Sequence, residues 1–566
     1  MSETIKWEEL SEVEKIKFES NYLRGTLVES MADPITGAIA PSDTQISKFH
    51  GFYQQYDRDI DKERKHQKLE PAYSFLIRVR MPGGLVTPEQ WLNMDTLSDT
   101  YANGTLKLTT RQTFQLHGVL KKNMKTTLQE INKSLLDTIS ACGDVNRNVM
   151  SHANPADSPL HAEAIEMANK IGSHLLPKTR AYHEIWLDEK LVADSKEEVE
   201  PLYGNRYLPR KFKIAVVIPP QNDCDVFSQD LGFIAIVKNN KIVGYNVAVG
   251  GGMGTTFGIP ETYPRLGTII GSCKPEQVVD VAEKLLMLQR DNGDRKNRKQ
   301  ARLKYTVDRM GIDNIKAEWE SRLGYKFDEA VPVKFERNGD NFGWKKGVDN
   351  KWHLTYFVEG GRVRNDDDKK LKTALKEIAK ISDGRFILTG NQNLIISGVS
   401  AEVKKKVDEI LKSFNVSPEE ISGLRKNSIA CVAMPTCPLA FAEAERYLPT
   451  LVSKIEIILK EFDLTKEEIV IRMTGCPNGC GRPYLAEIGL IGKSPGYYNL
   501  YLGGNFEGER LNTLYKETIQ EENILKELRP IIKDFAETRN PNERFGDFVI
   551  RKKYVAEIKE GKEFKH

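Results

Sequence analysis

Hydrophobic and polar positions begin to alternate regularly at residues 73–80, YSFLIRVR, and this alternation predicts a β-strand closed by the turn Pro82-Gly83-Gly84. Residues 1–70 are polar with helix-like patterning, and we interpret them as an N-terminal arm that leads into a domain. The N-terminus lacks a basic start followed by an apolar run, and no apolar stretch approaches the ~18 residues that a membrane span needs. We therefore expect a soluble, cytoplasmic protein with no membrane partner.

The strand pattern occurs twice, so the chain contains an internal repeat. GTLKLTTRQTFQLHGV, residues 104–119, aligns with GRFILTGNQNLIISGV, residues 384–399, and the upstream Gly83-Gly84 has its counterpart in Gly360-Gly361. Each copy is predicted to run strand, Gly-Gly turn, helix, strand.

A second pair of similar segments alternates with the first. YNVAVGGGMG, residues 245–254, aligns with YNLYLGGNFEG, residues 498–508. The order A, B, A′, B′ indicates a duplicated, pseudo-two-fold protein in which a ligand could sit where the halves meet.

The two copies of the repeat differ in charge. Three cations of the first copy align with neutral residues of the second: Arg80, Lys107 and Arg111 stand opposite Phe357, Ile387 and Asn391. On a symmetric fold, cationic function would be kept on one side only. The alternative is that solvated surface lysines and arginines have drifted without consequence.

Composition narrows the class of protein. A chain of 566 residues is long enough for about three to five packed units and for burying a large cofactor. Its 83 basic and 80 acidic residues leave a net charge of +3, which gives no global reason to expect nucleic acid as a partner. The basic run at residues 295–304 is interpreted as a solvated helix with one or two cations turned toward a bound cofactor, rather than a nucleic-acid patch, because no aromatic residue interleaves it before Tyr305.

The cysteines are the first candidates for a functional role, as ligands of a metal or metal cluster. An odd total of seven cysteines does not make a disulfide framework. Four of them form the pattern C-x5-C, thirty-eight residues, C-x3-C, and they are Cys431, Cys437, Cys476 and Cys480. Zinc sites prefer two to four residues between paired ligands, whereas four thiolates among glycines and prolines suit an iron–sulfur cluster. The other three, Cys142, Cys224 and Cys273, lack partners at metal spacing, and we expect them to be ordinary buried residues.

These cysteines lie in segments with a family resemblance. CVAMPTCPLAFAEAERYLP with RMTGCPNGCGRPYLAEIGLIGK resembles the cluster-binding signature of the siroheme-dependent sulfite and nitrite reductases. KFHGFYQQYDRD, LKLTTRQTFQLHGV, GDVNRN, YLPRKFKIAVVIPPQND and the C-terminal FGDF extend the resemblance over nearly the whole chain. It implies a [4Fe–4S] cluster held by the four cysteines, with Cys480 bridging the cluster to the iron of siroheme.

The resemblance also implies a fold. We expect an α+β, duplicated pseudo-two-fold structure with ferredoxin-like half-domains and siroheme/iron–sulfur domains. The expected units are an N-terminal arm (1–70), a first ferredoxin-like half-domain (71–150), a first siroheme-binding domain (151–345), a second ferredoxin-like half-domain (346–425) and an iron–sulfur cluster and siroheme domain (426–566).

Cations in separate segments provide the second candidate chemistry. Lys211 and Lys213 alternate in RKFKIAVVI, so on a strand they project to the same face, with a solvated strand edge as the alternative. The family resemblance implies substrate binding for Arg80, Arg147, Lys211 and Lys213, and contacts to the siroheme carboxylates for Lys107, Arg111 and Arg302. Lys107 stands where the family pattern leads us to expect arginine, and a lysine cannot make a bidentate carboxylate pair.

The resemblance implies the catalytic hemoprotein of an assimilatory sulfite reductase, which reduces sulfite to sulfide with six electrons for cysteine biosynthesis. GGGMG follows a strand but does not open a clear helix with an acidic residue ~20 positions on, so no flavin or nicotinamide fingerprint is found. Electrons must then come from a partner. ERKHQKLEPAYSF resembles the NADPH-dependent type, served by a separate flavoprotein subunit with FAD and FMN, and LTTRQTFQLHGVLKKN looks equally like the ferredoxin-dependent type.

Two other functions stay open. The first is a siroheme nitrite reductase that forms ammonia on the same scaffold. The second, from another class, is a non-catalytic iron–sulfur sensor or RNA-binding protein that uses the cysteines structurally.

Overall fold

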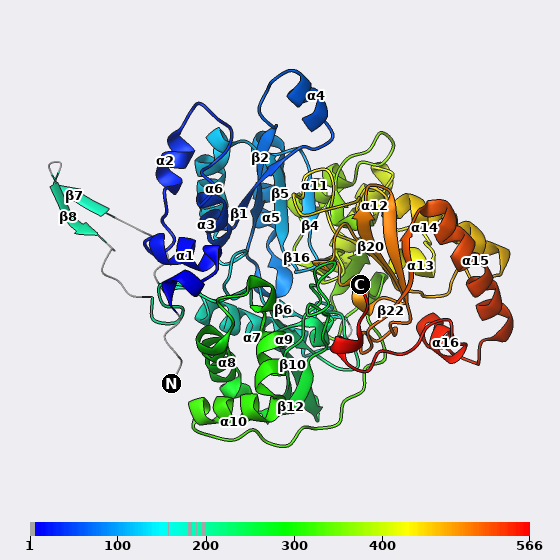
Figure 1. Cartoon of the computed structure of the whole chain (residues 1–566). Coiled ribbons are helices and arrows are strands. Elements are labelled where there is room, and N and C mark those ends of the chain that lie inside the picture. The colour runs from blue at the N-terminus through cyan, green and yellow to red at the C-terminus, as the bar shows by residue number, and fades with distance from the viewer. Residues whose placement is uncertain (1–5, 157, 179–183, 188–189, 195–199) are drawn as a thin grey trace.

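The computed structural model describes the chain except for residues 1–5, 157, 179–183, 188–189 and 195–199. Its described part contains four five-stranded sheets and one two-stranded sheet with helices packed around them, which confirms the expected α+β class (Figure 1). None of the described helices is long and apolar enough to cross a membrane.

Two sheets form the ferredoxin-like halves, and each contains a strand from the other half. Their orders are β1-β2-β5-β4-β15 and β13-β14-β17-β16-β3. The first consists of β1 (Phe52–Tyr56), β2 (Tyr73–Arg78), β5 (Phe114–Val119), β4 (Leu106–Leu108) and β15 (Arg362–Val363). The second consists of β13 (Gly343–Lys346), β14 (Trp352–Tyr356), β17 (Leu394–Val399), β16 (Arg385–Leu388) and β3 (Leu85–Val86). Because β3 and β15 follow the two Gly-Gly turns, each turn delivers a strand to the opposite half.

The Gly-Gly turns allow this exchange sterically. Gly84 has a φ of +71° and a Cβ there would lie 2.5 Å from the carbonyl oxygen of Leu388. Gly361 has a φ of +69° and a Cβ there would lie 2.4 Å from the carbonyl oxygen of Leu108. Only glycine fits both the left-handed backbone and the close approach of the other half.

The two halves share one hydrophobic core. Helix α5 (Pro88–Tyr101) of the first half packs against α11 (Leu371–Ile381) of the second. Trp91 of α5 is fully buried and stacks on Phe386 of β16 with ring centroids 4.8 Å apart. The halves therefore fold as one packed body rather than as separate units.

The other two large sheets repeat one topology. Their orders are β6-β9-β10-β11-β12 and β18-β19-β20-β21-β22, each with two parallel pairings followed by two antiparallel ones. The first consists of β6 (Met150–Ser151), β9 (Ile214–Val217), β10 (Leu231–Lys238), β11 (Lys241–Val249) and β12 (Thr268–Cys273). The second consists of β18 (Ser428–Ala430), β19 (Ile471–Thr474), β20 (Ile488–Ser494), β21 (Tyr497–Leu502) and β22 (Thr513–Ile519).

The loops that enter the site come from equivalent places in these sheets. In the first sheet Ile214 pairs with Leu231, and in the second Ile471 pairs with Ile488. The intervening segments, which we name loop L1 (218–230) and loop L2 (475–487), have the same length. The expected duplication is thus confirmed at the level of strand register.

The N-terminal arm supplies helices α1 (Glu12–Glu19), α2 (Leu27–Ala32) and α3 (Asp43–Ile46) beside the first half, and it also supplies β1 (Figure 1).

The basic run does not form the solvated helix that we expected. Residues 295–302 form turns around a short 3-10 helix, and α9 (Leu303–Met310) begins only at their end. Arg295 is buried and donates to Glu14 and to the carbonyl of Tyr207, while Lys304 is fully buried and donates to the carbonyl of Gly254 at 2.7 Å. The expected helix was wrong, and solvation holds for only part of the run, since Lys296 and Lys299 are exposed. Carboxylate and carbonyl oxygens inside the protein, rather than solvent, surround Arg295 and Lys304.

Candidate functional site

The four candidate cysteines lie at one edge of the sheet β18-β19-β20-β21-β22. Cys431 directly follows β18, whereas Cys476 and Cys480 lie in loop L2 after β19, which runs parallel to β18. Because the carboxyl ends of parallel strands meet at the same edge, these loops come together. Cys437 lies between β18 and helix α14 (Leu448–Glu461), and its N–H donates to the carbonyl of Ala433 at 3.0 Å.

Backbone and side-chain amides shape the space around the thiols. The N–H of Gly475 donates to Sγ of Cys431 at 3.3 Å, and Nδ2 of Asn478 donates to Sγ of Cys476 at 3.6 Å. A Cβ on Gly475 would lie 2.5 Å from the carbonyl oxygen of Ala442, so this position requires glycine. Hydrogen bonds of this kind to thiolates raise the reduction potential of a bound iron–sulfur cluster.

The thiols affect one another electrostatically, which places them around a common space. Burial raises the pKa of Cys431, and the charges of Cys480 and Cys476 raise it further. Burial and Cys480 also raise the pKa of Cys476 to about 12 and raise that of Cys437. Within the described residues, no group of three or more His, Cys, Asp or Glu side chains is gathered closely enough for a single metal ion. A cluster of several irons binds each thiolate at a different iron and so needs wider spacing.

Lys211 and Lys213 lie within electrostatic reach of Cys480, in the extended segment directly before β9. Burial, followed by the charge of Arg210, lowers the pKa of Lys211 to about 7, and burial and Lys211 lower that of Lys213, while the Cys480 thiolate opposes both shifts. Neither ammonium group makes a hydrogen bond or ion pair with any residue that the structure describes. Two partly buried cations without a protein counter-charge favour the binding of an anion.

Arg111 and Arg147 lie beside the lysine pair. The charge of Arg111 helps to lower the pKa of Lys213, and that of Arg147 helps to lower the pKa of Lys211. Burial lowers the pKa of Arg111 itself to about 9. Arg147 is nearly buried, and its Nε donates to the carbonyl of Gly143 at 2.8 Å. The charge of Arg302 acts on both lysines in the same way. The structure thus brings five of the predicted cations together.

Arg78, which sequence reasoning did not single out, extends this group. Burial alone would lower its pKa, but the thiols of Cys142 and Cys480 are among the groups that raise it. Arg80 has a different neighbour, because its Nη2 lies 3.7 Å from the carboxylate of Asp137. Residues 78 and 80 lie on the same side of an extended segment, so the alternation that drew attention to Arg80 contained an equal signal for Arg78.

Two of the predicted cations are engaged in buried ion pairs. Nζ of Lys107 lies 2.8 Å from a carboxylate oxygen of Glu445, and Lys107 also donates to the carbonyl of Gly360. Nη2 of Arg302 lies 2.9 Å from the carboxylate of Asp230. Protein carboxylates therefore neutralise both charges, and contacts of Lys107 and Arg302 to a cofactor stay a prediction.

Comparison with known proteins agrees with this arrangement. The ferredoxin-like half domain of nitrite/sulfite reductases matches residues 66–134 and 345–414, and the nitrite and sulphite reductase 4Fe-4S domain matches residues 166–327. The sulfite reductase [NADPH] hemoprotein beta-component of Anoxybacillus flavithermus is 60% identical over 556 residues, covering 98% of this chain and 97% of that protein. The proteins of the same name from Shouchella clausii and Bacillus subtilis are 58% identical at the same coverage.

Among solved structures, the NirA protein of Mycobacterium tuberculosis has a TM-score of 0.75 and 23% identity, and the match covers 96% of both chains, which shows a shared fold. Together with the relatives above, this assigns the chain to the nitrite and sulfite reductase family.

Proposed function

We propose that this chain is the hemoprotein component of an assimilatory, NADPH-dependent sulfite reductase, which reduces sulfite to sulfide with six electrons in sulfur assimilation and cysteine biosynthesis. The observation that carries the proposal is the pair Lys211 and Lys213, two partly buried cations without a protein counter-charge in the described residues, within electrostatic reach of Cys480. The names of the relatives at 58% and 60% identity support sulfite as the substrate.

The donor set fits a [4Fe–4S] cluster and a siroheme. The residues that would hold the cluster are Cys431, Cys437, Cys476 and Cys480, and Cys480 would also bind the siroheme iron. Thiolates are the ligands that iron–sulfur clusters take, and the N–H of Gly475 already donates to one of the sulfurs. When bound, the two groups would relay the electrons of an external donor and supply the metal centre that sulfite reduction needs.

The siroheme carboxylates would meet cations. The candidates are Lys107, Arg111 and Arg302. Arg111 fits this role best, because it has no ion pair with a carboxylate among the described residues: its Nη1 donates to Gln229 and its Nη2 to the carbonyl of Ile214, and its buried Nε has no hydrogen-bond partner. The other two already pair with Glu445 and Asp230.

The chain's own residues would bind the oxyanion and deliver protons. As ammonium groups, Lys211 and Lys213 hold sulfite oxygens and donate protons to them as the S–O bonds break. A pKa of about 7 lets Lys211 both give and regain a proton near neutral pH. Arginine is a poor acid, so Arg78, Arg80 and Arg147 are assigned to binding only.

Electrons would come from a flavoprotein that carries FAD and FMN and accepts electrons from NADPH, with ferredoxin as the alternative donor. The relatives are named as NADPH enzymes, which favours the flavoprotein. Comparing sulfide formation with NADPH and purified flavoprotein against reduced ferredoxin separates the two donors. We place the chain in the cytoplasm because none of its seven cysteines, all of which the structure describes, forms a disulfide, as is usual in a reducing compartment.

The test of function is the ratio of anaerobic kcat/KM for sulfite and for nitrite, measured on the cofactor-loaded protein with a reduced dye as donor. We expect a clear preference for sulfite, with sulfide as the product. A preference for nitrite, with ammonia as the product, would assign the rival activity and contradict our interpretation of the cations. A preparation without siroheme would favour a non-catalytic iron–sulfur sensor or RNA-binding protein.

A further inference from the structure

Loops L1 and L2 place Asp225 and Arg482 at equivalent positions of the duplicated fold. Asp225 has a φ of 47° and Arg482 a φ of 55°, and each directly precedes a 3-10 helix, Val226–Ser228 in L1 and Pro483–Leu485 in L2. Non-glycine residues with positive φ are uncommon. The duplicated fold thus gives both loops the same backbone conformation at this position.

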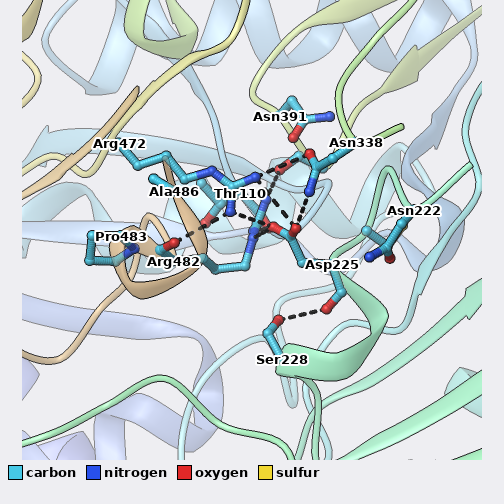
Figure 2. Close-up of polar contacts among 12 residues, drawn as sticks. Thr110, Asn222, Asp225, Ser228, Asn338, Asn391, Arg472, Arg482, Pro483 and Ala486 are labelled. Atoms are coloured by element: carbon cyan, nitrogen blue, oxygen red, sulfur yellow. Dashed lines mark hydrogen bonds and ion pairs between the residues drawn. The ribbon is translucent and has the colours of Figure 1, made fainter. Parts of the chain in front are cut away.

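The two side chains meet as a buried ion pair (Figure 2). The Asp225 carboxylate accepts from Nε of Arg482 and from Nη1 of Arg472, the latter at 2.7 Å, and Asn338 donates to the same carboxylate. The side chains of Asp225, Arg472 and Arg482 are 0%, 1% and 6% exposed. Burial alone would raise the pKa of Asp225, but the two guanidinium groups outweigh it and lower the pKa, so the carboxylate stays charged.

Arg482 also joins the two ferredoxin-like halves. Its Nη1 donates to the carbonyl of Thr110 at 2.9 Å and its Nη2 to the carbonyl of Gly390 at 2.8 Å. Thr110 and Gly390 are equivalent in the repeat, because they stand at the same place in the aligned segments LTTRQ and LTGNQ. One guanidinium therefore bridges the same carbonyl of both copies, and its planar geometry fixes their separation.

Thr110 extends this arrangement to the candidate site. Its Oγ1 donates to the carbonyl of Cys480 at 2.9 Å, and the next residue is Arg111. Cys480 is itself only two residues from Arg482 in loop L2. A shift of the Arg482 guanidinium would thus move the Thr110 turn and the backbone of Cys480 relative to each other.

We propose that the Asp225–Arg482 pair is a positioning device that holds the Cys480 thiolate in register with the turn carrying Arg111. The proposal rests on the proposed function, since it treats Cys480 as the ligand shared by the cluster and the siroheme. A shared thiolate couples the two centres electronically, so displacing Cys480 changes their coupling. Sulfite binding by Lys211 and Lys213, which do not contact the pair, changes little.

The test uses the full-length protein with both cofactors. Arg482→Lys keeps a positive charge but cannot span both carbonyls, and Thr110→Val removes only the hydroxyl that donates to Cys480. Asp95→Asn is the matched control, because Asp95 is equally buried and also takes two cations, Lys372 at 3.0 Å and Lys376 at 2.9 Å, in the contact between α5 and α11. For each protein we would measure thermal unfolding, iron and siroheme content, the electron paramagnetic resonance signature of coupling between the two centres, and kcat and KM.

We expect Arg482→Lys and Thr110→Val to alter the coupling signature and to lower kcat about tenfold or more, with KM nearly unchanged. Asp95→Asn should lower the unfolding temperature and leave the signature unaltered. A wild-type signature and kcat in Arg482→Lys would overturn the proposal, and if that variant fails to fold, the same result in Thr110→Val would overturn it. The signature is read without sulfite, so a wild-type protein that does not reduce sulfite contradicts the proposed function and still allows this comparison.

Discussion

Single residues decide where negative charge can bind, and Arg78 and Arg80 differ in this respect. The Arg80 guanidinium has the Asp137 carboxylate beside it, whereas Arg78 lies within electrostatic reach of the Cys480 thiol. We expect Arg78→Gln to lower kcat/KM for sulfite about a hundredfold, as for the loss of one donor to a reacting oxyanion. Arg80→Gln, the matched control two residues farther along the chain, should lower kcat/KM for sulfite much less. If steady-state assays instead show the larger loss of kcat/KM for Arg80→Gln, Arg80 rather than Arg78 is the principal sulfite ligand.

The lysine pair leads to a pH prediction. Anion binding needs the ammonium form, and Lys211 has a pKa of about 7 in the ligand-free protein. Affinity for sulfite should therefore be full well below pH 7 and fall as the pH rises through 7. Lys211→Arg keeps its charge throughout this range, so KM for sulfite should rise less steeply with pH than in the wild type. Parallel pH profiles would contradict the assignment, because any titration of sulfite itself is common to both proteins.

At the scale of single residues, the sequence predicts the candidate site residues that stand in a recognisable local pattern. The cysteine spacing and the alternating lysines are two such patterns, and the structure brings these residues together. The Asp225–Arg482 pair has none, because its members are far apart in the sequence and meet only through the duplicated fold. Whether Lys107 and Arg302 are free to bind a ligand was equally hidden, since Glu445 and Asp230 are distant in the chain.

At the scale of elements, the N-terminal arm contacts the cysteine loop through Arg58. Its Nε, Nη1 and Nη2 donate to the carbonyls of Pro435, Ala440 and Cys437 at 3.0, 2.9 and 2.7 Å. Leaving such carbonyls without donors costs about 1–3 kcal/mol each when they are buried. The arm thus holds the loop that carries Cys437.

We expect Arg58→Gln to loosen this loop, so that the purified protein retains less iron and acid-labile sulfide after exposure to air. The control is Arg446→Gln, which removes an exposed ion pair between the arm and the cluster domain, Arg446–Asp59 at 2.6 Å. Exposed pairs contribute only about 0–1 kcal/mol, so iron retention should stay near the wild-type level. Equal losses in both variants would show that docking of the arm as a whole, rather than the Arg58 contacts, protects the cluster.

Elements were predictable where periodicity and turns are strong. The strand, Gly-Gly turn, helix and strand of each copy are confirmed. The exchange of β3 and β15 between halves was not predictable, because a strand of two residues has no periodicity. The solvated helix at residues 295–304 failed for a related reason, since charge alone does not distinguish cations in water from cations that bind buried carboxylates and carbonyls.

For the whole molecule, Glu445 joins three parts of the chain next to the cluster. It accepts from Lys107 of the first half at 2.8 Å and from Arg362, whose strand β15 completes the same sheet, at 2.6 Å. Its own N–H donates to the carbonyl of Cys431 at 3.0 Å. Burial alone would raise the pKa of Glu445, but Lys107 and Arg362 outweigh it and lower the pKa to about 2.

We expect Glu445→Gln to lower the free energy of unfolding by about 3–5 kcal/mol at neutral pH, because it leaves two buried cations without a counter-charge. The folded pKa of Glu445 is depressed, so its contribution is complete above the unfolded value of about 4.5 and is lost as the pH falls toward 2. The difference in unfolding temperature between wild type and variant should therefore shrink between pH 5 and pH 3, measured by calorimetry. Glu443→Gln, which removes a partly exposed partner of Arg446, is the control and should have a small effect. If Glu445→Gln lowers the free energy of unfolding by the same large amount at every pH, Glu445 stabilises the fold through packing rather than through its charge.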